Sequence, residues 1–132
     1  MTTRQAACSC GQLRLTCTGE PVRISICHCL ECQRRTGSAF GAQARFPRAQ
    51  VTAIEGQATQ YMRRGDSGGS LTFHFCPHCG STVYWVLDAA PDLVTVAVGA
   101  FADPAFPPPL HSVYERRRHG WVIPPTATEH LD

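Results

Sequence analysis

Hydrophobic and polar residues alternate with a period of two along much of the chain. In residues 12–18, Leu13, Leu15 and Cys17 fall on one face and polar residues on the other, which predicts a half-buried strand. The same alternation predicts three further strands, at residues 22–26, 71–75 and 81–87. Residues 93–98 are apolar on both faces, and we expect them to form a central strand.

Glycine, proline and aspartate separate these segments. We expect turns at residues 19–21, 65–69 and 88–92, because these residue types supply a positive or preset φ without a side-chain clash. The pattern indicates one short helix from Cys29 to Thr36, ended by Gly37, and the 10 prolines and 11 glycines argue against long helices. The sequence therefore predicts a mainly β fold with at most one or two short helical turns.

Composition limits the classes of protein to consider. The 132 residues have room for a single domain, residues 1–132. No run approaches the roughly 18 apolar residues of a membrane-spanning helix, and the first eight residues lack the apolar segment of a secretory signal. The net charge is only +2, and the basic run at residues 116–119 is too short for a nucleic-acid-binding stripe. We expect a cytoplasmic protein that binds neither membrane nor nucleic acid.

Eight cysteines make metal binding the central question. Cys17 stands alone, and the other seven form three clusters: Cys8 and Cys10; Cys27, Cys29 and Cys32; Cys76 and Cys79. In a reducing compartment such clusters are metal ligands or catalytic groups more often than disulfides. Bridges between residues i and i+2 are also strained, and seven thiols cannot pair completely. This pattern favours zinc, with an iron–sulfur cluster as the remaining alternative.

The segment Cys76-Pro77-His78-Cys79-Gly80 is a zinc knuckle by pattern, because the Cys-x-x-Cys turn directs two sulfurs at one point. A structural zinc needs two further ligands. The N-terminal pair of cysteines can supply them and leave the central trio as a separate site. Alternatively, two of the trio complete the knuckle and the N-terminal pair is left over. The first arrangement uses all seven clustered thiols.

A zinc ion held by Cys27, Cys29 and Cys32 would keep one coordination position open for water or a substrate sulfur. The alternative is a purely structural site whose fourth ligand is His28, His74, Glu31 or Cys17. His28 lies between two ligands in an extended segment and should point away from them, to orient another group or to meet solvent. We interpret His74 as a strand histidine and Cys17 as a small core residue.

The cysteine motifs resemble those of a known family. They are Cys8-Ser-Cys10-Gly11, then Cys27-His-Cys29-Leu-Glu-Cys32-Gln-Arg34-Arg-Thr36-Gly37-Ser38-Ala-Phe40, then Phe75-Cys76-Pro-His-Cys79-Gly80-Ser81. In this order they resemble the glutathione-dependent formaldehyde-activating enzyme (GFA, or centromere protein V domain) family over about residues 6–121. Gly99-Ala-Phe101-Ala-Asp103-Pro104, His111 and Trp121 also lie where the family tends to have similar residues.

The resemblance implies a tent-like antiparallel β fold with two zinc ions per chain. It implies a structural site at Cys8, Cys10, Cys76 and Cys79 and a catalytic site at Cys27, Cys29 and Cys32. It also implies a carbon–sulfur lyase that joins a small thiol, glutathione, to formaldehyde or cleaves the adduct. The alternative is a non-enzymatic zinc module that carries thiol adducts or binds a protein partner. We expect three residues beside the trio to contact substrate: Arg34, Thr36 and Ser38.

Overall fold

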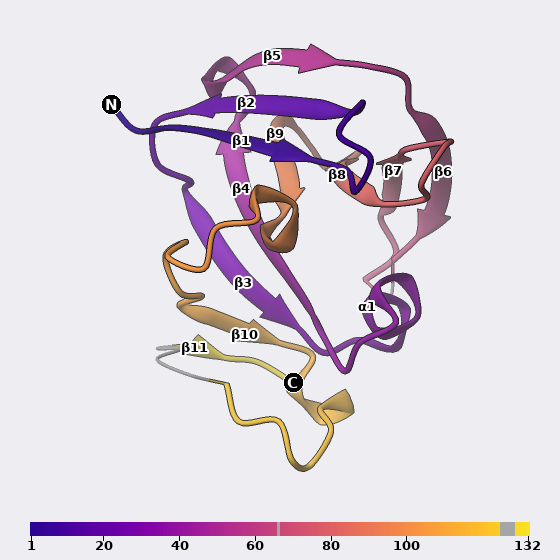
Figure 1. The fold of residues 1–132 in the computed structure, drawn as a ribbon. Helices are drawn as coiled ribbons and strands as arrows, with labels where there is room; N and C mark the ends of the chain where they lie inside the picture. Colours follow the sequence, from indigo (N-terminus) through magenta and orange to yellow (C-terminus); the bar gives the residue numbers. More distant parts are fainter. Residues whose placement is uncertain (66, 125–128) are drawn as a thin grey trace.

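The computed structural model describes residues 1–65, 67–124 and 129–132. Within them the strands form two sheets (Figure 1). The three-stranded sheet has the order β1-β2-β5, with β1 (Thr3–Ala7), β2 (Arg14–Thr18) and β5 (Val51–Glu55). The eight-stranded sheet has the order β11-β10-β3-β4-β9-β8-β7-β6 and contains β3 (Arg23–Cys27), β4 (Gly41–Pro47), β6 (Thr59–Arg64), β7 (Ser70–Phe75), β8 (Thr82–Leu87), β9 (Ala90–Ala97), β10 (His111–Val113) and β11 (Glu129–His130).

Helical structure is limited to short segments. The α-helix is α1 (Leu30–Thr36), and the 3-10 helices are η1 (Arg48–Gln50), η2 (Val98–Phe101) and η3 (Glu115–Arg117). In Figure 1 the three-stranded sheet crosses one end of the molecule, and α1 lies with β10 and β11 at the opposite end. None of the described helices is long and apolar enough to cross a membrane. The expectation of a mainly β fold with little helix is confirmed.

The predicted alternating strands are present. Leu13, Leu15 and Cys17 are all fully buried, and β2 begins at Arg14, two residues after the predicted start. The strand predicted at residues 93–98 is central, because β9 lies between β4 and β8 and Val94 and Val96 are both buried. However, β9 starts at Ala90, which pairs with Leu87. The turn expected at 88–92 is therefore shorter than predicted.

Most neighbouring strands are antiparallel as expected, but β10 runs parallel to β3 and β11 runs parallel to β10. In the turn expected at 65–69, the amide of Gly68 donates to the carbonyl of Gly65 at 2.9 Å. Asp66, within that turn, lies outside the described residues.

The helix begins and ends where the sequence indicates. Cys29 is its N-cap, and its Sγ accepts a hydrogen bond from the Cys32 amide at 3.3 Å. Gly37 ends the helix in the left-handed conformation, with φ 64° and its amide donating to the Gln33 carbonyl at 2.9 Å. Glycine adopts this conformation without the steric cost that a Cβ brings. The short helix thereby fixes two of the central cysteines relative to each other.

Strand β4 was not expected from the sequence. Ala44 and Phe46 are fully buried in the main core, whereas Gln43 and Arg45 lie on the opposite face, at a pocket. The alternation of apolar and polar residues along β4 does not report its two faces clearly, because the face that carries large polar side chains is also largely buried. This face of the eight-stranded sheet positions the site described next.

Candidate metal centres

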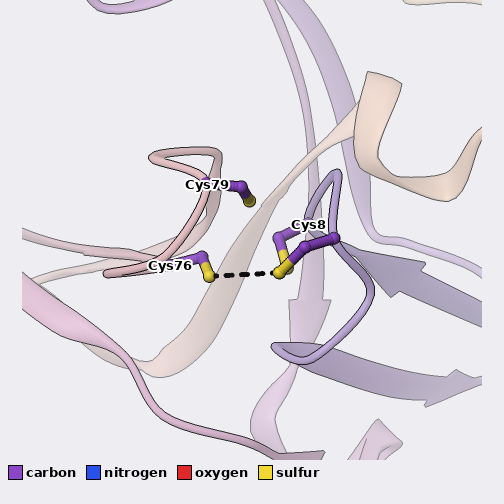
Figure 2. Close-up of side chains that lie close together, drawn as sticks. Cys8, Cys76 and Cys79 are labelled. Carbon is purple, nitrogen blue, oxygen red and sulfur yellow. Dashed lines mark hydrogen bonds between the residues drawn. The ribbon is translucent and has the colours of Figure 1, made fainter.

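Four cysteines from two distant loops meet beside the main core. Cys8 and Cys10 follow β1, and Cys76 and Cys79 follow β7. Their Sγ atoms all lie within 4.8 Å of one another, and Figure 2 shows the side chains of Cys8, Cys76 and Cys79 converging. The Sγ of Cys10 is 3.6 Å from that of Cys8 and 3.6 Å from that of Cys76. Tetrahedral zinc with bonds of about 2.3 Å separates its sulfurs by about 3.8 Å, so the arrangement fits a bound zinc.

Each of the two loops turns at a glycine with positive φ. Gly11 has φ 84° and donates its amide to the Cys8 carbonyl at 3.0 Å, and Gly80 has φ 81° and donates to the Cys76 carbonyl at 2.8 Å. The amides also turn toward sulfur: those of Leu13 and His78 lie 3.3 Å from the Sγ atoms of Cys8 and Cys76, respectively. Such N–H donors stabilise thiolate, the form that binds metal.

Gln12, which was not among the expected site residues, supports the same cluster. Its Nε2 donates to the Cys76 Sγ at 3.0 Å and to the Gln57 carbonyl at 2.7 Å, while its Oε1 accepts from the Gln57 amide at 2.8 Å. Hydrogen bonds from the Ser81 amide and hydroxyl lower the pKa of Cys79 to about 5. Even without metal, part of this cluster therefore favours thiolate at neutral pH.

The second cluster lies at the junction of β3 and α1. Cys27 ends the strand, Cys29 caps the helix and Cys32 lies in its first turn. Their Sγ atoms lie within 4.8 Å of one another, and all three residues are buried. Hydrogen bonds from the Cys27 and Cys32 thiols lower the pKa of Cys29, while the same sharing of protons raises that of Cys27. A thiolate thus forms most readily at the helix N-terminus.

Within the described part of the chain, no histidine or carboxylate joins these three sulfurs. His28 is fully buried and its Nε2 lies 3.0 Å from the Ser112 hydroxyl. The expectation that it does not bind the metal agrees with this geometry, but the suggestion that it meets solvent is wrong. His74 stacks on Tyr84 with ring centroids 4.2 Å apart. Glu31 pairs with Arg34 on the exposed side of the helix.

Two arginines lie near the three-cysteine cluster. Arg63 lowers the pKa of Cys29 as a minor contribution after the neighbouring thiols, whereas the pKa of Cys32 is raised overall and the charge of Arg35 offsets only part of that rise. The Arg35 guanidinium lies 4.4 Å from the centroid of the Trp85 ring. A Cβ on Gly41 would come within 2.9 Å of its Nη2, so glycine at this position leaves room for the cation. Both charges would offset the net negative charge of zinc bound by three thiolates.

The three cysteines line a pocket of about 450 Å³. Val113 and Tyr114 pack against the cluster from β10 and the residue after it. Tyr114 has a positive φ of 56° and its hydroxyl lies 2.6 Å from that of Ser67. The other polar groups of the pocket wall include Arg23, Ser25, Gln43, Arg45 and Arg63. The cluster thus opens into a cavity with a surplus of positive charge.

The residues expected to contact substrate lie elsewhere. Arg34 and Ser38 line a separate hollow with Trp121, and Thr36 lines a third one. The Thr36 hydroxyl donates to the Cys32 carbonyl at 2.8 Å and accepts from the Ser38 amide at 3.1 Å, which supports the end of the helix. Their contact with substrate stays a prediction. The arginines of the cysteine-lined pocket were not predicted from the sequence. A signal existed for Arg23, because Arg23, Ser25 and Cys27 are spaced two apart and therefore share one face of a strand.

Comparison with known proteins gives the class of this protein. The sequence model of the glutathione-dependent formaldehyde-activating enzyme family, GFA, matches residues 3–117, so the chain belongs to this family. A search of curated proteins finds no match. Among solved structures, a Rhodobacter sphaeroides protein is similar, with a TM-score of 0.58, 19% identity, and coverage of 79% of this chain and 91% of the other. That likeness supports the fold.

Proposed function

We propose that the protein is a zinc enzyme of the carbon–sulfur lyase class. It adds a small thiol such as glutathione to an aldehyde such as formaldehyde, or cleaves the adduct. Cys27, Cys29 and Cys32 hold the catalytic zinc, and Cys8, Cys10, Cys76 and Cys79 hold a structural zinc. The observation that carries the proposal is that three buried thiols, with no fourth protein ligand among the described residues, line a substrate-sized pocket.

The donor sets support two different roles. Four thiolates close the coordination of zinc and cross-link the chain, whereas three leave a position open. When bound by three thiolates, zinc supplies a soft Lewis acid at which a thiol loses its proton near neutral pH. In the addition, the sulfur forms a bond to the carbonyl carbon and the thiol proton ends on the aldehyde oxygen.

The chain's own residues position and shield the reactants in this proposal. The Cys32 amide orients the Cys29 sulfur through its hydrogen bond. Val113 and Tyr114 cover the cysteines from one side and exclude water there. Tyr114 and Ser67 are the paired hydroxyls of the pocket wall, and they are the groups we assign to donate a hydrogen bond to the aldehyde oxygen.

The decisive experiment measures metal content and exchange kinetics together. We expect two zinc ions per chain and a faster exchange of labelled formaldehyde with glutathione, followed by NMR, than in buffer alone. Cys29→Ser should lose one zinc and the acceleration, while Cys17→Ser, a matched change at a cysteine outside both clusters, should keep both. Loss of one zinc in Cys29→Ser with unchanged acceleration would refute the proposal.

Cobalt substitution tests the open coordination position directly. Glutathione added to the cobalt protein should change its visible absorption, because the thiol becomes a ligand. No change, together with no acceleration, would favour a zinc module whose metals serve only the fold.

A further inference from the structure

Paired residues on β3 and β4 form a polar ladder that leads away from the cysteines along the pocket. The two strands are antiparallel, and their register pairs Cys27 with Gly41, Ser25 with Gln43 and Arg23 with Arg45. Residues two apart share a face of a sheet, and every member of the ladder except Gly41 lines the pocket. One end of the pocket therefore carries thiols and the other end carries a pair of arginines.

The arginine pair is unfavourable by itself. Like charges directly opposite each other on neighbouring strands destabilise a sheet. Arg23 is partly compensated, because its Nη2 lies 3.6 Å from a Glu129 carboxylate oxygen. Arg45 forms no salt bridge with any described residue, and its Nε is buried without a hydrogen-bond partner. Burial and the neighbouring Arg23 also lower the pKa of Arg45.

A second polar atom beside Arg45 is also unsatisfied. Gln43 is 9% exposed, and its Oε1 is buried without a partner. Unpaired buried groups of this kind cost free energy that a bound ligand can recover. Among the described residues of the pocket wall, Asp132 alone carries a carboxylate, which is exposed and lies 3.8 Å from Arg116. The pocket thus offers an uncompensated cation and a free acceptor side by side.

We propose that Arg45, together with Arg23, binds a carboxylate of the thiol substrate, and that Gln43 accepts a hydrogen bond from a substrate amide. This inference rests on the proposed function and specifies its substrate class. A guanidinium binds carboxylate through two parallel hydrogen bonds, which gives both affinity and orientation.

The length of the ladder also indicates how long the substrate is. Cys27 and Arg23 are four positions apart at the two ends of β3, which places their backbones about 14 Å apart at about 3.4 Å per residue. A thiol substrate whose carboxylate lies many bonds from its sulfur suits this spacing. The class that fits is a peptide thiol whose carboxylate is several bonds from sulfur, as in glutathione.

Calorimetry on the zinc-loaded protein separates this site from the metal chemistry. S-methylglutathione keeps both carboxylates but has no free thiol, and its diethyl ester lacks the carboxylates. We expect Arg45→Gln to weaken S-methylglutathione binding at least tenfold and Arg45→Lys to weaken it less. Arg64→Gln is the matched control, because Arg64 is exposed on β6 and is not among the residues lining the pocket. The diester should bind wild type and Arg45→Gln equally weakly.

Kinetics provide a second readout that a merely structural arginine would not change. In Arg45→Gln the KM for glutathione should rise at least tenfold, while kcat/KM for the neutral thiol 2-mercaptoethanol stays within twofold of wild type. Zinc content and melting temperature verify folding, and removal of one of two opposed cations should not lower the melting temperature.

The inference is overturned if wild type does not bind S-methylglutathione, if the diester binds as tightly as the acid, or if Arg45→Gln and wild type bind alike. Failure of the proposed function is a different result. A wild-type protein without exchange activity, but with binding of S-methylglutathione that depends on Arg45, would refute the enzyme and leave the anion site standing.

Discussion

The two cysteine clusters should differ in what they contribute to stability, because they cross-link the chain over different distances. Cys10 and Cys76 are 66 residues apart, whereas Cys27 and Cys32 are five positions apart. Treated as a covalent cross-link, closure of the long loop stabilises the fold by about 4 kcal/mol and closure of the short one by about 2 kcal/mol. The shift in melting temperature is the free-energy change divided by the entropy of unfolding, which is about 2.1 cal/mol/K per residue for 132 residues. The two contributions therefore correspond to about 14 °C and about 7 °C in melting temperature.

Two double variants test this difference. Cys10→Ser/Cys79→Ser removes two exposed ligands and should lower the melting temperature by about 14 °C, and Cys29→Ser/Cys32→Ser by about 7 °C. The assay is thermal unfolding followed by circular dichroism, with zinc content measured on each sample. In excess chelator the variants should approach metal-free wild type, which isolates the metal from side-chain effects. An equal or reversed order of the two decreases, or decreases that persist in chelator, would refute the reasoning.

Three further predictions concern positions outside the metal clusters. Cys17→Ala should keep two zincs per chain and lose about 1 kcal/mol of stability from its fully buried site; loss of a zinc would show that the cysteine is a ligand after all. Gly37→Ala should cost about 1 kcal/mol in chemical denaturation because the position has a positive φ; no cost would contradict the left-handed cap. Hydrogen bonds from Ser112 and then His130 lower the pKa of Glu115 below its ordinary 4.5, so its stabilisation is present above that pH and lost as the pH falls through the folded-state value. The melting-temperature difference between wild type and Glu115→Gln should therefore shrink below pH 4.5, and a constant difference would contradict it.

Local chemistry explains why much of the fold could be predicted. The alternation that predicted β2 reports a strand with one buried face, and Leu13 and Leu15 are indeed buried. A glycine directly after the helical stretch can adopt the left-handed conformation that ends a helix, so the end of α1 was visible as well. By contrast, β4 was missed because Gln43 and Arg45 occupy a buried polar face, and no local pattern distinguishes such a face from a loop.

The grouping of the cysteines was likewise predictable in part from local sequence and in part only from the fold. Spacing alone favoured a knuckle and a trio, because ligands close in sequence can reach one ion. Counting ligands favoured Cys8 and Cys10 as the pair that completes the knuckle, but it could not show that the chain brings them there. Cys8 and Cys76 meet only because β1 and β7, in different sheets, bring their following loops to the same side of the main core. Strand pairing over long sequence separations made that choice.

Thiols at ligand spacing, a short capped helix and strands with one apolar face follow from local sequence. The surroundings of these elements follow from the folded chain. It placed Arg45 opposite Arg23 in the pocket. A charge in a strand faces a neighbour only once the register of the adjoining strands is set, and register is a property of the whole sheet.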